Sequence, residues 1–467
     1  NQERKMCSEF PYEFIIQGNN MNGKSMVEGA PWKSIVKFAL PVLFGSFVQQ
    51  LYNTVDTAVV GHFGNATALP AVGTTGAIAF LFLAIAIGFS AGNGVLVAQH
   101  YGANNEEKVR SNSATGITLL IVMGAILSVL GILVAEPIFK YILAVPAENL
   151  NQSIVYFRIY AAGLIFQYGY NIFSSILRSV GDSLATLLFL MVSSVINALL
   201  DLLFVAIFRW DVAGAAIATV ISQFISFVAA YLYMRKKYSI FRFQWSDYNL
   251  ERTNVFNTMK VGMPIALQMM VVSCGQTLIQ RAVNQFKDAM MASFAAAQRM
   301  EMYINIPCMA MQTTMATYAG QNIGAGRLDR VKKGLRQAMV INMAFTLLIS
   351  VLIWIFPNAI TQIFNLNAQA SAYCFDHLRT IALVNLILAM YIPLFGLYQG
   401  AGHSMFPMVV SIFALSVRVL VTYLFRYSAF FGYTIIWWNS LFGFGTGLIL
   451  TWTYYFSKRW QKGIHSV

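Results

Sequence analysis

Long apolar stretches constrain this chain more than any other feature of its sequence. A helix needs about 20 apolar residues to cross a bilayer, and residues 116–135, 184–208 and 339–356 reach that length without a charge at their centres. Across the 467 residues, 58% are hydrophobic and only 10% are charged, which is too apolar for a single soluble core. We therefore expect an all-α membrane protein that uses the lipid bilayer as part of its solvent.

Twelve membrane spans are expected along the chain. Their approximate limits are residues 33–62, 67–100, 108–135, 151–179, 183–208, 212–236, 254–286, 289–321, 329–356, 371–400, 404–426 and 432–457.

The basic residues are read as topology signals and not as a nucleic-acid surface, although the net charge is +13. Lys and Arg crowd residues 108–110, 235–252, 327–336 and 458–462, whereas the opposite loops carry only scattered cations such as Lys140. Cytoplasmic loops of membrane proteins carry the excess of Lys and Arg. The sequence thus predicts a multi-pass protein of the plasma (inner) membrane with both termini in the cytoplasm.

The chain repeats itself after about 223 residues. The segment ALP at 39–41 returns as GMP at 262–264, AQHYGA at 98–103 returns as GQNIGA at 320–325, and RSVGDS at 178–183 corresponds to QGAGHS at 399–404. Matched landmarks in one order indicate duplication of a six-span unit. Parallel repeats are a transporter architecture whose binding site lies near the membrane midplane between the halves.

The duplication predicts the domain organisation. The expected parts are an N-terminal cytoplasmic extension (1–30), an N-lobe of spans 1–6 (31–237), a cytoplasmic connecting loop (238–252), a C-lobe of spans 7–12 (253–460) and a cytoplasmic tail (461–467).

Two acids inside predicted spans are the strongest candidates for function. A charged side chain at the bilayer centre costs at least about 2.5–3.5 kcal/mol, yet Asp56 lies within the first span and Asp201 within the fifth. Asn197 precedes Asp201 by one helical turn and shares its face, and Thr219 on the sixth span offers a hydroxyl oxygen. Such oxygens suit a proton or Na⁺. The alternative is that both acids only brace their helices.

The second half lacks this acidic pair. Its equivalents of Asp56, Asn197 and Asp201 are Ile279, Arg418 and Thr422. The asymmetry favours ion coupling in the first lobe and a structural or counter-charge role for Arg418. Glu301 on the eighth span is either a second titrating site or a salt-bridged scaffold residue.

A cavity between the halves is expected to be lined by polar and flexible side chains. Ten of the 22 methionines lie between residues 263 and 315, and flexible thioethers suit promiscuous binding, although lipid-facing or packing roles are the alternative for each one. The candidate cavity residues are Gln49, Asn53, Gln268, Met270, Gln276, Glu301 and Arg418.

Pro41 sits inside the first span and is a candidate hinge. Proline removes a backbone hydrogen bond and can kink a helix, so the span could bend when Asp56, fifteen residues further on, changes charge. A static kink is the alternative.

Several motifs together resemble one known family along residues 31–460. They are VDT at 55–57 with VG at 60–61, LRSVGD at 177–182, GQNIGAG at 320–326 and QGAG at 399–402. With the duplicated plan, the chain resembles a multidrug and toxic compound extrusion (MATE) transporter, and within that family the branch related to DNA-damage-inducible protein F.

The resemblance implies an antiporter with a V-shaped central cavity. Small organic compounds, often cationic, would leave while H⁺ or Na⁺ enters, with no other cofactor and with the monomer as the working unit. It also implies that Asp56, Asn197, Asp201 and Thr219 form the first-lobe cation site and that Pro41 is the bending proline. The NorM-type branch carries second-lobe acids that this sequence lacks, since the matching regions contain Gln268, Met270 and Asn385.

Other functions remain as alternatives. A flippase of lipid-linked saccharides or an exporter of a specific metabolite would share the architecture, and a channel fits the composition less well. An intramembrane enzyme is disfavoured because the sequence contains no His-Glu-x-x-His motif, and its Gly-x-Ser-x-Gly match, GFSAG at 88–92, lies inside a predicted apolar span and not at a strand-to-helix elbow. The four histidines at predicted span ends are expected to be solvated or to cap helices, namely His62, His100, His377 and His403.

Overall fold

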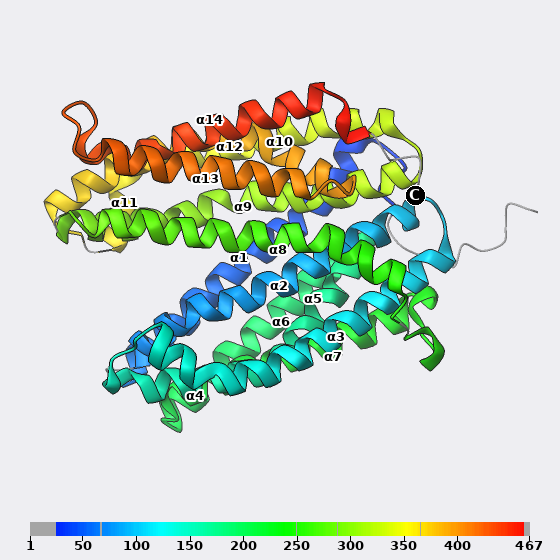
Figure 1. Ribbon diagram of the computed structural model, residues 1–467, viewed down its shortest axis with the longest axis horizontal. Helices are drawn as coiled ribbons and strands as arrows, with labels where there is room; N and C mark the ends of the chain where they lie inside the picture. Colours follow the sequence, from blue (N-terminus) through cyan, green and yellow to red (C-terminus); the bar gives the residue numbers. More distant parts are fainter. Residues whose placement is uncertain (1–24, 66–67, 249, 287, 365, 462–467) are drawn as a thin grey trace, which may run out of the picture.

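The computed structural model describes residues 25–65, 68–248, 250–286, 288–364 and 366–461. Within these ranges the chain is helical, and its helices form two bundles that lie one above the other in Figure 1. We call the end of the molecule that holds residues 25 and 461 the terminal end, on the right of Figure 1, and the opposite end the distal end. The expected extension 1–30 and tail 461–467 lie largely outside the described residues.

The first bundle, the N-lobe, contains seven α-helices and two short π-helical turns. They are α1 (Pro31–Phe63), α2 (Ala68–Gly102), α3 (Glu106–Pro137) followed by the turn Ile138–Ile142, α4 (Ala147–Ala162), α5 (Leu164–Ser179), α6 (Ser183–Asp201) followed by the turn Leu202–Ile207, and α7 (Asp211–Lys237).

The second bundle, the C-lobe, repeats this plan. Its helices are α8 (Arg252–Val283), α9 (Asp288–Gly324), α10 (Leu328–Ile355), α11 (Pro357–Ile363), α12 (Ala368–Gly400), α13 (Met405–Phe425) and α14 (Ile435–Phe456). Each of the twelve predicted spans corresponds to one long helix of the list, with two differences: the fourth span is two helices that meet at Gly163, and the short α11 was not expected.

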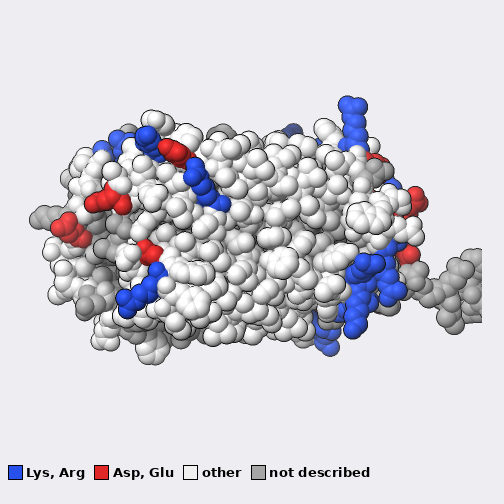
Figure 2. Space-filling view, turned by 90° about the horizontal axis from the view of Figure 1, so that it is seen from below, with Lys and Arg blue, Asp and Glu red and all other residues white. Residues whose placement is uncertain are grey.

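The outer surface is suited to lipid. Among the described residues, nine helices are long and apolar enough to cross a membrane. Large apolar side chains such as Leu133 and Val195 are more than half exposed. Figure 2 shows one face with a broad uncharged belt between two charged ends, and Lys and Arg gather at the terminal end. This distribution is typical of a protein that spans a bilayer.

Small residues allow the two lobes to approach closely. Where α2 crosses α8, Gly88 faces Ala266 and Gly92 faces Gly262, and a side chain at Gly92 would overlap the backbone of α8. Small residues at helix crossings let backbones pack in membranes, where the hydrophobic effect adds little. The lobes are therefore in contact along α2 and α8 in the half nearer the terminal end.

The repeated motif AQHYGA/GQNIGA makes reciprocal contacts that join the lobes at the terminal end. Gln99 Nε2 donates to the carbonyl oxygen of Gly400 at 2.8 Å, and its repeat equivalent Gln321 donates to that of Ser179 at 2.7 Å. Both glutamine side chains are buried. The two bonds are related by the internal repeat, so the duplication seen in the sequence is also a structural symmetry.

Segments that precede each lobe reinforce this closure. Before α1, the carbonyl oxygen of Gly29 accepts a bond from Arg330 at 2.8 Å, and Met26 N donates to Gln321 Oε1 at 2.8 Å. Before α8, Asp247 forms an ion pair with Arg110 of α3 at 2.5 Å. Each segment thus ties the lobe that follows it to the other lobe.

A buried carboxylate organises the turn between α5 and α6. Asp182 caps α6 and accepts bonds from Lys237 at 2.6 Å, Tyr238 at 2.7 Å and Tyr233 at 2.9 Å. Burial alone would raise the pKa of Asp182, but these hydrogen bonds outweigh it and hold the pKa below its ordinary value. The turn is therefore fixed to the end of α7.

Candidate functional site

The two acids singled out in the sequence meet inside the N-lobe. Asp201, the last residue of α6, is fully buried, and its carboxyl group lies close enough to that of Asp56 on α1 for the two groups to interact directly. Immediately after Asp201 the helix widens into the π-helical turn Leu202–Ile207. Such turns are rare and frequently mark functional sites. Two carboxyl groups in contact avoid repulsion when a proton or another cation lies between them.

Asn197 and Thr219 complete the same cluster. The Asn197 side chain has the amide orientation in which both its nitrogen and its oxygen find hydrogen-bond partners. Its nitrogen donates to Asp201 Oδ2 at 2.9 Å, and its oxygen accepts a bond from the Thr219 backbone N–H at 3.2 Å. The Thr219 hydroxyl accepts from Tyr52 at 3.4 Å. The four residues predicted to form one site therefore lie together, and Asn197 and Thr219 are buried.

Two oxygens in this cluster have no hydrogen-bond partner among the described residues. They are Asp56 Oδ1 and Asp201 Oδ1, and both are buried. Buried acceptors are normally satisfied, and a carboxylate oxygen accepts bonds or coordinates a cation. The cluster consequently offers unused oxygen ligands of the kind that bind H⁺ or Na⁺. Within the described ranges, no group of three or more His, Cys, Asp or Glu side chains forms a metal site.

Tyrosines that were not predicted surround the acidic pair. Tyr52, Tyr156 and Tyr160 are each close enough to interact electrostatically with the acids or with one another. Tyr160 donates to Gln167 at 3.0 Å. A signal was present in the sequence, because Tyr52 precedes Asp56 by four residues and Tyr156 precedes Tyr160 by four, which places each pair on one helix face.

The C-lobe holds a different buried group in the corresponding region. Arg418 is buried, donates to Asn439 at 2.8 Å and lies over the ring of Phe444. The expectation that Arg418 lines the central cavity is corrected accordingly, because its side chain is held between α13 and α14. Glu301 is close enough to Arg418 for their charges to interact, but the two side chains do not form an ion pair.

His377 corrects another expectation. It was placed at a span end and expected to be solvated or to cap a helix, but it lies inside α12 and is 2% exposed. Its ring stacks between Phe294 and Trp437 at centroid distances of 5.4 and 4.7 Å. Apolar packing on both faces makes it a core residue of the C-lobe.

A cavity of about 590 Å³ lies between the lobes and is bounded by α1, α2, α5, α6 and α9. Gln49 and Pro41 line it, and Gln49 hydrogen-bonds Asn53 one turn further along α1. Of the other candidate cavity residues, Gln268 bonds Ser411 within the C-lobe. Met270, Gln276 and Glu301 lie outside this cavity. Of the candidate cavity residues, Gln49 therefore lines this space, whereas Asn53 and the C-lobe candidates are not part of its lining.

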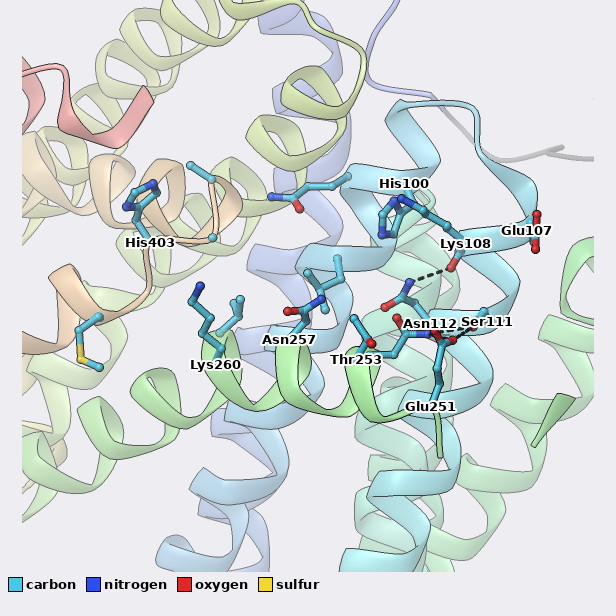
Figure 3. Close-up of a pocket in the computed structure, with 17 residues that line it drawn as sticks. His100, Glu107, Lys108, Ser111, Asn112, Glu251, Thr253, Asn257, Lys260 and His403 are labelled. Atoms are coloured by element: carbon cyan, nitrogen blue, oxygen red, sulfur yellow. Dashed lines mark hydrogen bonds between the residues drawn. The ribbon is translucent and has the colours of Figure 1, made fainter. Parts of the chain in front are cut away.

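A second space, of about 790 Å³, lies at the terminal end between the end of α2, the starts of α3 and α8, and the turn before α13. Figure 3 shows Glu251, Lys108 and His100 at one side of it, and Lys260 extending toward His403 at the other. Most of the residues that line it have polar or charged side chains, and they come from both lobes. No sequence motif pointed to this cavity.

Fold and site together define a duplicated helical membrane transporter with buried carboxylates in one lobe. The family model described as MatE matches residues 41–203 and 264–424, one stretch in each lobe. The chain therefore belongs to the MatE family.

Individual relatives cover most of this chain. The probable multidrug resistance protein YpnP of Bacillus subtilis is 28% identical over 402 residues, which are 85% of this chain and 88% of YpnP. An FAD transporter of Shewanella oneidensis is 25% identical over 72% of this chain and 75% of its own length. A solved outward-facing multidrug resistance MATE family transporter superposes with a TM-score of 0.87 at 22% identity, covering 94% of this chain and 97% of the other. The two-lobe fold is thereby confirmed, while membership of the branch related to DNA-damage-inducible protein F stays a prediction.

Proposed function

We propose that this protein is a secondary active exporter that exchanges organic compounds for H⁺ or Na⁺ across the plasma membrane. One observation carries the proposal: Asp56 and Asp201 meet on helices of one lobe, each with a buried oxygen that has no partner among the described residues. A transporter core that contains such acids has a place to bind and release a cation, and intramembrane acids of this kind mark ion pathways.

The arrangement of the lobes supports alternating access. Reciprocal bonds from Gln99 and Gln321 close the terminal end, while the helices of the two lobes diverge toward the distal end in Figure 1. The gathering of Lys and Arg at the terminal end favours a cytoplasmic location for that end and for both termini. The structure then corresponds to an outward-facing state.

The acidic pair is placed where it can influence α1. Asp56 lies on α1, the helix that also lines the central cavity through Pro41 and Gln49. A cation bound between the carboxyl groups of Asp56 and Asp201 would hold α1 against α6. When the cation leaves, the two negative charges would repel each other and favour separation of the two helices. In this mechanism Pro41 is the position at which α1 bends, because its ring removes one helical hydrogen bond.

The substrates proposed are small organic molecules, with the monomer as the working unit and without a cofactor other than the coupling ion. Several relatives are named as multidrug resistance or multidrug export proteins, which supports a drug-like range. Export of one specific metabolite is the second candidate, favoured by the relative named as an FAD transporter. A flippase of lipid-linked saccharides is less favoured, since one cation, Arg178, lines the central cavity described above.

Transport in reconstituted liposomes tests the proposal. We expect a fluorescent organic probe to move against its gradient when an inward H⁺ or Na⁺ gradient is imposed, and to stop when the matching ionophore collapses it. The probes would span cations, zwitterions and neutral compounds. If folded protein moves none of them under either gradient, ion-coupled export of such compounds is wrong.

A further inference from the structure

Arg178 is a charged residue in the central cavity that the coupling mechanism does not use. It lies in the last turn of α5, is partly exposed, and lines the cavity of about 590 Å³ between the lobes. The same wall contains Tyr170 and Asn171 of α5 and Thr186 of α6, and the opposite wall is formed by α9. A ligand in this space would therefore touch both lobes, as a transported substrate must.

The guanidinium group of Arg178 has no hydrogen bond or ion pair with any other described residue. Nearby polar groups are already engaged: the Tyr170 hydroxyl donates to the Thr186 carbonyl at 3.4 Å, and the Asn171 amide donates to the Gln167 carbonyl at 2.8 Å. Arginine carries five donors and stays charged. An unpaired cation within a membrane-spanning bundle is costly, so it marks a functional site by default.

The rest of the cavity wall has no charge to balance Arg178. The remaining lining residues have aliphatic, methionine, amide, hydroxyl or phenol side chains or are glycine and proline, and examples are Leu190, Met309 and Gln49. None of these side chains carries a charge at neutral pH. The space thus combines one fixed positive charge with apolar walls and several neutral amides and hydroxyls.

A helix-capping role does not account for this arrangement. A cation in the last turn of α5 interacts favourably with the helix dipole, which explains why the charge is tolerated there. It does not explain why the side chain lines a cavity shared with α9 and has no acceptor among the described residues. The planar guanidinium group is suited to binding a carboxylate or phosphate through two parallel hydrogen bonds.

We infer that Arg178 forms a subsite for the acidic group of an amphipathic substrate, whose apolar body packs on the aliphatic and methionine side chains of the same cavity. The substrates favoured are organic acids and zwitterions that carry a carboxylate, sulfonate or phosphate, and not permanent cations without an acid. This inference deepens the proposed export function and rests on it for transport, but the binding step can be measured without any ion gradient.

A matched pair of probes tests the subsite. Rhodamine B carries a free carboxylate, and its ethyl ester has the same ring system without that charge. Binding of each to the full-length protein in nanodiscs is followed by fluorescence polarisation. We expect the wild type to bind the acid more tightly than the ester, and Arg178→Gln to weaken binding of the acid by about tenfold or more while binding of the ester changes little.

Arg178→Lys separates charge from structure. This variant should still bind rhodamine B more tightly than its ester, because lysine keeps the positive charge. It loses the planar pair of N–H donors that the arginine guanidinium offers, so part of the preference should be lost. Thermal unfolding of all three proteins reports whether they are folded. Equal losses for acid and ester in Arg178→Gln, or a wild type that prefers the ester, would overturn the subsite. Selective binding without gradient-driven transport would instead contradict the export function and leave the subsite intact.

Discussion

Asp56→Asn is expected to abolish ion-driven transport. In proteoliposomes with an imposed gradient, the rate for the variant should fall to that of liposomes without protein. The physical reason is that an amide cannot take up and release a proton and adds no negative charge for Na⁺, so the site shared with Asp201 no longer exchanges a cation. Asp201→Asn should give the same loss, because the two carboxyl groups form one unit.

Two controls make this result specific. Glu136→Gln removes an exposed acid that lies 3.9 Å from Arg158 on the surface, and it should transport at the wild-type rate. Binding of the rhodamine probes by Asp56→Asn should persist, since Asp56 does not line the cavity. Gradient-driven transport by Asp56→Asn at more than half the wild-type rate would show that coupling occurs elsewhere.

Gly262→Val is expected to prevent closure of the terminal end. Gly262 lies against the backbone of Gly88 and Phe89, and its Cβ would come within 2.8–2.9 Å of them, closer than packed atoms allow. Overpacking of this kind typically costs about 1–3 kcal/mol. The cost falls only on the state in which α2 and α8 are in contact, so the variant should favour a state in which the terminal end is open and transport should be lost.

Labelling of a buried reporter cysteine measures this shift. In a cysteine-free background, Val95→Cys lies in the contact between α2 and α8, where Val95 is 5% exposed, and should resist a membrane-impermeant maleimide. Adding Gly262→Val should make it react many-fold faster. Gly445→Val is the matched control, because a side chain there meets open space. Protection that survives in folded Gly262→Val protein would mean that this contact is not part of the closure.

The helices and the two-lobe plan could be predicted from the sequence because the sequence features that indicate them are local. Apolar stretches of membrane-spanning length mark the helices without any knowledge of their neighbours, and the repeated motifs give the order of the lobes. The break at Gly163 and the helix Pro357–Ile363 were missed, since neither changes the apolar character of its surroundings.

The site was only partly accessible from the sequence. The Asn197–Asp201 pairing follows from helical spacing, whereas the contact between Asp56 and Asp201 joins residues 145 positions apart and was expected only from the family resemblance. The span that contains Arg418 is apolar on most of its faces, so the direction in which this side chain points depends on helix packing. For that reason the side chain of Arg418 was misplaced, and Arg178 was quoted only as part of a motif.

The exchange itself gives the most direct test of the central claim. An outward gradient of a transported probe is imposed on proteoliposomes that contain no ion gradient, and opposite movement of H⁺ is followed with a trapped pH-sensitive dye and of Na⁺ with a radioactive tracer. We expect one of the two ions to move into the lumen that the probe leaves, in wild-type protein and not in Asp56→Asn. If the wild-type protein moves the probe and neither H⁺ nor Na⁺ moves in the opposite direction, the proposed exchange of organic compounds for H⁺ or Na⁺ is wrong.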